Sequence, residues 1–147
     1  MRVVLVLAAG CIYMPHSYSH LSTPFPGKRV ELSCLDLAVG ITEDDRAPRA
    51  IEYSFGNRCF HSVVVDLASV RAFGRYPDGH TVELAAYDPK HEIVPLPIDG
   101  LWKGDERIEY AAADSAVPAA ICVDVGKIDR SGPASEHWVC VGMWELP

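Results

Sequence analysis

Short apolar runs separated by turn residues constrain this chain of 147 residues more than any other sequence feature. From Val30 onward, apolar and polar positions alternate within these runs, a period of two that is typical of strands with one buried face. Prolines limit continuous helix, at positions 89, 95, 97, 118 and 133. The pattern predicts an all-β domain over residues 30–147, an antiparallel β-sandwich of about seven to eight strands.

The individual runs differ in how clearly they predict strands. Residues 51–55 alternate cleanly, and Tyr76-Pro77-Asp78-Gly79-His80 predicts a turn that joins strands 70–73 and 81–84 into a hairpin. Between the runs 30–33 and 35–41 the apolar parity changes, which predicts a bulge near Cys34. Further strands are expected at 63–65, 92–94, 107–110, 120–125 and 137–141.

The predicted sandwich resembles the immunoglobulin fold in a loose sense only. An immunoglobulin domain carries a Trp between its two characteristic cysteines and a Tyr two residues before the second. Here the first Trp is Trp102, and Ala120 and Trp138 stand two residues before Cys122 and Cys140. The resemblance therefore implies an architecture and names no specific family.

The N-terminus has the three parts of a secretory signal. Arg2 precedes an apolar run from Val3 to Gly10, and small residues lead into Cys11. The sequence Leu7-Ala8-Ala9-Gly10-Cys11 resembles the lipobox of bacterial lipoproteins. That resemblance implies a signal peptide at 1–10, a lipid on Cys11, and a Pro/Ser-rich tether over 11–29. It covers only the first eleven residues.

This segment also resembles two other kinds of sequence. A Leu-Ala-Ala-Gly stretch also opens the nucleotide-binding loop of sugar nucleotidyltransferases, but the glycines and basic residue that cradle phosphate do not follow Cys11. Residues 3–7 would also suit a buried first strand of a cytosolic α/β protein. In that case deletion of residues 1–29 would destroy the fold, whereas a leader and tether could be removed without harm.

Five cysteines divide into one plus four under the lipoprotein interpretation. An even set in a small exported domain predicts two disulfides. Three pairings are open, and the nearest-neighbour pairing is favoured because consecutive strands often lie side by side. It joins Cys34 to Cys59 and Cys122 to Cys140.

The acidic residues are confined to the body of the chain. None precedes Glu31, so the body carries all 20 acids against 10 of the 13 basic residues, a net charge of −10. A polyanion would be repelled by this charge, which argues against a nucleic-acid partner. The contrast also supports two regions with different roles, a near-neutral head and an acidic domain.

No standard catalytic motif is present in the sequence. The chemical alternative is a small periplasmic metal- or thiol-dependent enzyme that uses Cys59, His61, His137 and Cys140, residue types that bind zinc. The spacing is poor for zinc, and disulfide formation would compete for the sulfurs. Trp102 and Trp144 are candidate interface residues, with a cap on the core as the simpler role.

The sequence therefore predicts a non-catalytic lipoprotein of the bacterial cell envelope that faces the periplasm or the cell surface. Its expected attachment to the membrane is the lipid on Cys11, and it is expected to need neither metal nor cofactor. The domain would bind a ligand or an envelope protein, or serve as a structural part of an assembly. The alternative is the metal- or thiol-dependent enzyme.

Overall fold

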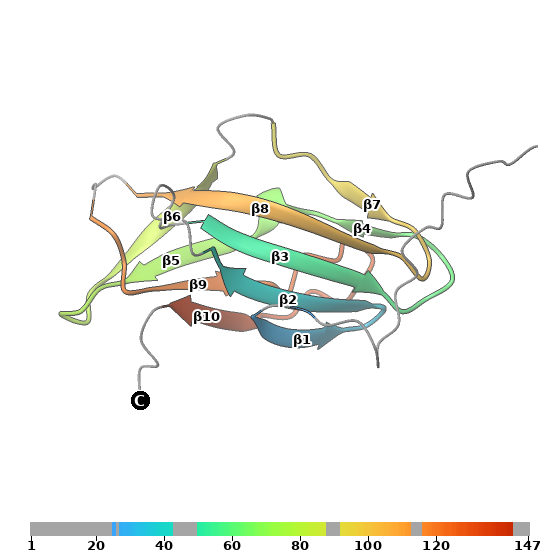
Figure 1. The fold of residues 1–147 in the computed structure, drawn as a ribbon, viewed down its shortest axis with the longest axis horizontal. Helices are drawn as coiled ribbons and strands as arrows, with labels where there is room; N and C mark the ends of the chain where they lie inside the picture. Colours follow the sequence, from blue (N-terminus) through green and yellow to red (C-terminus); the bar gives the residue numbers. More distant parts are fainter. Residues whose placement is uncertain (1–24, 26, 43–49, 88–91, 113–115, 143–147) are drawn as a thin grey trace, which may run out of the picture.

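The computed structural model describes residues 25, 27–42, 50–87, 92–112 and 116–142. Every strand pair in this part of the chain is antiparallel, which confirms the prediction of an all-β antiparallel fold. The described elements, shown in Figure 1, are β1 (Lys28–Leu32), β2 (Leu35–Ile41), β3 (Ala50–Asn57), β4 (Val63–Val65), the 3₁₀ turn η1 (Leu67–Ser69), β5 (Arg71–Arg75), β6 (Thr81–Tyr87), β7 (Leu96–Ile98), β8 (Lys103–Ala111), β9 (Ala120–Asp124) and β10 (Trp138–Gly142).

Eight strands form one continuous sheet in the order β1-β2-β3-β8-β6-β5-β9-β10. The sheet turns a corner within β6, because residues 81–84 pair with β5 and residues 85–87 pair with β8. This corner stacks the two halves of the sheet, and β10 comes close to β2 at the other side. The sandwich is therefore nearly closed, with β4 and β7 as a separate two-stranded ribbon.

The first hairpin corrects the expected bulge near Cys34. Leu32 pairs directly with Leu35, so Ser33 and Cys34 form a two-residue turn, and Ser33 takes the positive φ of 32°. A two-residue turn places even-numbered residues of β1 opposite odd-numbered residues of β2, which explains the change of parity. Strand β1 also begins at Lys28, two residues before the expected start of the domain.

The second hairpin has the turn that its sequence predicts. Tyr76 and His80 are joined by a backbone hydrogen bond of 3.0 Å, and Gly79 supplies the positive φ of 89°. The carboxylate of Asp78 accepts the backbone N–H of His80 at 3.1 Å. This hydrogen bond, with a second one from the His80 ring, holds the pKa of Asp78 below its ordinary value. Both residues therefore act in the turn.

Strand β7 lies at 96–98 instead of the expected 92–94. Pro97 pairs with Val64 in the short β4–β7 ribbon, where a residue without an N–H is tolerated because β7 has β4 as its one strand partner among the described residues. The prediction of a strand at 92–94 was wrong because it used local β propensity alone, which does not determine which segment pairs with another strand.

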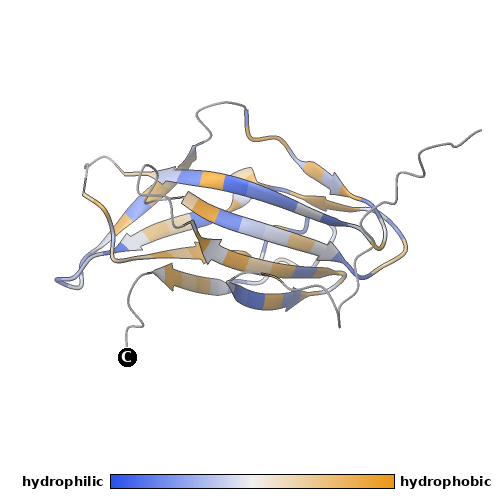
Figure 2. Cartoon of the chain, viewed as in Figure 1, coloured by the Kyte–Doolittle hydropathy of each residue, from blue (hydrophilic) through white to orange (hydrophobic). Residues whose placement is uncertain are grey.

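The core lies between the two stacked halves of the sheet. Exposure alternates along β8, as a strand with one inward face requires, and Figure 2 shows this strand as mostly hydrophilic with a hydrophobic segment toward its arrowhead. The largest wholly enclosed side chains include Tyr53, Phe55 and Tyr110, and the rings of Tyr53 and Phe55 stack with centroids 6.3 Å apart. The hydroxyls of Tyr53 and Tyr110 hydrogen-bond each other inside this apolar core.

The tyrosine pair predicts a specific pattern of stability changes. Tyr53→Phe leaves the Tyr110 hydroxyl buried without its partner, so we expect a loss of about 1–3 kcal/mol. The double variant with Tyr110→Phe should lose less than the sum of the two single variants, because no hydroxyl is then stranded. Urea unfolding of the four proteins measures this coupling. Strictly additive losses would contradict it.

The same pair predicts loss of stability in alkali. Burial raises the pKa of Tyr53, with the neighbouring Tyr110 adding to the rise, and burial also raises the pKa of Tyr110. Unfolded tyrosine loses its proton near pH 10, while the folded pair keeps both protons. The unfolded state therefore binds fewer protons above pH ~10, and stability falls as pH rises further. Urea unfolding from pH 8 to 11 should show a smaller decline in the double variant.

Candidate functional site

Loops from three parts of the chain meet at one end of the sheet, on the right in Figure 1. They are the turn Ser33-Cys34, the segment 58–62 between β3 and β4, and the segment 99–102 between β7 and β8. Backbone hydrogen bonds tie them together: Arg58 N–H donates to Cys34 O at 2.7 Å, and Leu101 N–H donates to Cys59 O at 3.0 Å. We call this group of loops the tip.

Asn57, the last residue of β3, organises the tip from inside. Its side chain is fully buried, and its Nδ2 donates to the carbonyls of His61 at 2.7 Å, Ile98 at 2.9 Å and Asp99 at 3.2 Å. Its Oδ1 accepts the N–H of Cys59 at 2.9 Å. One amide side chain thus supplies four hydrogen bonds to backbone that could not pair in a sheet.

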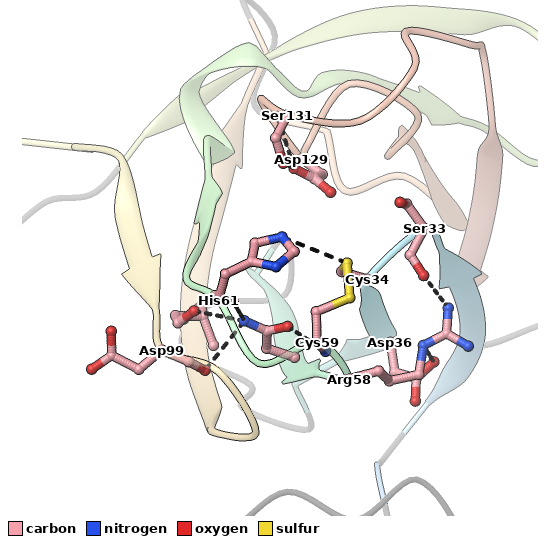
Figure 3. Close-up of a disulfide and its surroundings, with 11 residues drawn as sticks. Ser33, Cys34, Asp36, Arg58, Cys59, His61, Asp99, Asp129 and Ser131 are labelled. Atoms are coloured by element: carbon pink, nitrogen blue, oxygen red, sulfur yellow. Dashed lines mark hydrogen bonds and ion pairs between the residues drawn. A yellow bond between two sulfur atoms is a disulfide. The ribbon is translucent and has the colours of Figure 1, made fainter.

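The disulfide Cys34–Cys59 joins the first two loops of the tip (Figure 3). Beside it, the guanidinium of Arg58 donates to the carbonyl of Ser33, and its Nε lies 3.3 Å from Oδ1 of the buried Asp36. Arg29 approaches the other oxygen of Asp36 at 3.7 Å. Arg58 thus connects the segment 58–62 to the Ser33-Cys34 turn and to β2, and Arg29 of β1 is the second cation beside the buried carboxylate.

Two large apolar side chains point outward from this fixed frame. Phe60 is 90% exposed, the highest value among the exposed large hydrophobic residues, and Leu101 is 37% exposed. Leu101 also adopts a φ of 61°, a conformation that costs a leucine free energy and is found where surrounding structure imposes it. Gly100 is required beside them, because a Cβ there would lie 2.3 Å from the carbonyl oxygen of Phe60.

The second disulfide joins Cys122 on β9 to Cys140 directly opposite on β10. Cys122 has no exposed surface, and Phe73 lies opposite it on β5. The rings of Phe73 and Trp138 pack together with centroids 5.0 Å apart. Both disulfides follow the nearest-neighbour pairing favoured from the sequence, and each contributes about 2–4 kcal/mol by restricting the unfolded chain.

The structure brings together only part of the predicted metal set. His61 lies next to the Cys34–Cys59 disulfide, whereas Cys140 belongs to the other disulfide and His137 to the β9–β10 connection, where its N–H donates to Asp124. Among the described residues, the one gathered metal-type group is Cys34, Cys59 and His61. Of the four ligands predicted for the enzyme alternative, Cys59 and His61 lie together, and Cys34 joins them in place of His137 and Cys140.

The remaining predicted site residues have varied positions. Trp102 is half-buried and packs against the core, and its carbonyl accepts the N–H of Asn57 at 2.9 Å, so it has a structural role at the tip. Trp144, Cys11 and residues 1–24 of the predicted leader and tether lie outside the described residues. Among the described residues, no helix has the length and apolar character needed to cross a bilayer.

Sequence reasoning missed Asn57, Phe60 and Leu101. Asn57 ends an apolar run and is followed by Arg-Cys-Phe, a pattern that predicts only an ordinary turn. Leucine rarely adopts a positive φ, so the residue type at position 101 gave no indication of its conformation. Gly100 could have indicated the tip, since a glycine between two strands can allow a close backbone contact. The sequence does not show that this contact is with Phe60.

The fold and the paired cysteines define a class, an antiparallel all-β domain with two disulfides. No protein-family model matches the chain, and no curated protein matches it in sequence. Among solved structures, the chain is similar to the crystal structure of the yjhA protein from Bacillus subtilis. The TM-score is 0.47 at 9% identity, and the match covers 80% of this chain and 97% of that chain.

Proposed function

We propose that this protein is a non-catalytic lipoprotein of the bacterial cell envelope, anchored by a lipid on Cys11. The observation that carries the proposal is the division of the cysteines. Four are paired in two disulfides, which supports an oxidising compartment, and the fifth ends the lipobox-like Leu7-Ala8-Ala9-Gly10-Cys11. An envelope location accounts for both features at once.

The function of the domain in this proposal is to bind a protein partner of the envelope through the tip. Strand β1 runs from Lys28 toward the turn Ser33-Cys34, so the tether joins the domain at the end of β1 that lies away from the tip. Five residues of strand separate the two ends by about 15 Å. The anchor therefore leaves the tip accessible.

The rigidity of the tip supports a binding role. Ordering a loop on association costs free energy, and a loop that is already fixed avoids that cost. Asn57 and the disulfide hold the backbone on both sides of Phe60, while its ring remains exposed to solvent. An aromatic side chain held in this way is suited to a contact with an apolar recess on a partner protein.

Phe60→Ser should abolish the contact without unfolding the domain. Because the ring is 90% exposed, we expect a stability change within about 0.5 kcal/mol. Cross-linking of the anchored protein in intact cells should give a discrete adduct with the wild type and lose it in the variant. Val117→Ser is the matched control, since Val117 is 47% exposed and belongs to the connection between β8 and β9, which lies at the end of the sheet away from the tip in Figure 1.

Two results would count against the tip as the binding surface. One is an adduct that persists at full yield in Phe60→Ser. The other is equal loss of the adduct in Phe60→Ser and Val117→Ser, which would place the contact elsewhere or show it to be nonspecific.

A further inference from the structure

Cys34, Cys59 and His61 form a compact group of metal-type side chains at the tip (Figure 3). Their ligand atoms all lie within 4.8 Å of one another, and Nε2 of His61 lies 3.9 Å from Sγ of Cys34. Cysteine thiolate and histidine imidazole are the ligands that zinc prefers in proteins. In the disulfide form the two sulfurs are bonded to each other and cannot serve as thiolates.

We propose that reduction of the Cys34–Cys59 disulfide creates a binding site for a zinc-class d¹⁰ metal ion, with Cys34, Cys59 and His61 as ligands. The inference is independent of whether Cys11 carries a lipid. A Cys₂His set leaves the fourth tetrahedral position to water, because His61 is exposed at the surface of the tip.

The position of His61 fits this ligand set. With Zn–S of about 2.3 Å and Zn–N of about 2.0 Å, a tetrahedral angle places the sulfur and nitrogen about 3.5 Å apart. The distance of 3.9 Å from His61 Nε2 to Cys34 Sγ is within a few tenths of an ångström of that value. The two sulfurs need to separate to about 3.8 Å, a movement that side-chain rotation can supply once the bond between them is broken.

The backbone of the site does not depend on the disulfide. Arg58 N–H donates to Cys34 O, which holds the two cysteine-bearing loops together. Asn57 fixes the carbonyl of His61 and the N–H of Cys59 within the second loop. These hydrogen bonds persist after reduction, so the three ligands are expected to stay close enough to share one ion.

The two disulfides differ in their access to a reductant. Cys34 and Cys59 are both partly exposed and lie in loops, whereas in the other bridge Cys122 is fully buried in the centre of a strand and only Cys140 is partly exposed. Thiol–disulfide exchange requires that a thiolate reach a sulfur along the S–S axis, so the bridge with both sulfurs partly exposed is expected to react first. Cys34–Cys59 is therefore the bridge that a dithiol would open while Cys122–Cys140 remains closed.

The chemistry balances with a dithiol as reductant. The dithiol gives up two electrons and two protons and closes into its own disulfide, and Cys34 and Cys59 become two thiols. Zn²⁺ then displaces both thiol protons as it binds the thiolates, while His61 coordinates through a neutral ring nitrogen. No further oxidant or reductant takes part.

The test uses the purified full-length protein with Cys11→Ser, which removes the one cysteine outside the two disulfides, treated with limiting dithiol. We expect alkylation and peptide mapping to find Cys34 and Cys59 free and Cys122–Cys140 intact. The reduced protein should bind one Cd²⁺ or Zn²⁺ per chain, with the ultraviolet absorption band of a Cd–thiolate bond, and the oxidised protein should show no such band. Loss of a residue that only orients a metal ligand weakens metal binding by ~10–100-fold. Because His61 is proposed as a ligand itself, His61→Ala should weaken Cd²⁺ binding by more than this.

His80→Ala is the matched control, because His80 is also exposed but lies in the β5–β6 turn at the opposite end of the sheet. It should leave Cd²⁺ affinity unchanged. The proposal would be overturned by earlier opening of Cys122–Cys140, by reduced protein that gives no thiolate band, or by equal affinity in His61→Ala and the wild type. None of these outcomes depends on a partner protein or on lipid attachment.

Discussion

Cys11→Ser is expected to release most of the protein from the membrane fraction. The variant lacks the thiol that would accept the lipid. A lipid chain contributes about 0.8 kcal/mol of membrane affinity per buried methylene, so its loss removes most of the attachment. Fractionation of cells that express the tagged wild type and the variant measures the effect.

The domain itself should be unchanged in this variant. Cys11 takes no part in either disulfide, so the folded variant should retain Cys34–Cys59 and Cys122–Cys140. Ser19→Ala, a neutral change within the predicted tether, is the control and should remain with the membranes. If Cys11→Ser sediments with membranes as the wild type does, Cys11 is not the anchor.

Asn57→Ala is expected to cause the largest loss of stability of any single substitution at the tip. It removes the four contacts of a fully buried side chain and takes this partner from the carbonyls of His61 and Ile98 and from the N–H of Cys59, while the carbonyl of Asp99 keeps the N–H of Trp102. Buried groups without partners cost about 1–3 kcal/mol each, but water entering the space would satisfy some of them, so we expect a loss of about 3 kcal/mol. Urea unfolding under oxidising conditions gives the value.

A matched control separates this effect from a general sensitivity of the loops. Ser62→Ala removes one hydrogen bond, from Ser62 Oγ to Asp99 Oδ1 at 2.7 Å, at the exposed side of the same loops. It should change stability by less than about 0.5 kcal/mol. Equal effects of Asn57→Ala and Ser62→Ala would contradict the organising role of Asn57.

The all-β architecture was predictable because the physical cause acts locally. The apolar residues that alternate in residues 51–55 all lie in the core, although β3 is buried at nearly every position. Pro77-Asp78-Gly79 forms the β5–β6 turn through its own backbone preferences. The disulfides follow the same logic, since Cys122 and Cys140 lie opposite each other on consecutive strands. Features set by neighbours in the sequence could be read from the sequence.

The tip could not be predicted because its parts come from distant segments. Asn57 contacts the carbonyls of Ile98 and Asp99, about forty residues further along the chain, and no local pattern records that pairing. Strand β6 pairs with β5 through its first half and with β8 through its second half. This division likewise depends on distant strands and has no local sequence signal. The predicted metal-ligand set of Cys59, His61, His137 and Cys140 was incomplete for the same reason. The fold brings Cys59 and His61 together but adds Cys34 in place of His137 and Cys140.

Intact mass of the protein extracted from membranes, measured before and after reduction, tests the central proposal most directly. The account predicts a chain that begins at Cys11, carries the added mass of a lipid, and gains about 4 Da on full reduction as two disulfides open. A chain that retains Met1, carries no lipid and gains no mass on reduction would contradict it.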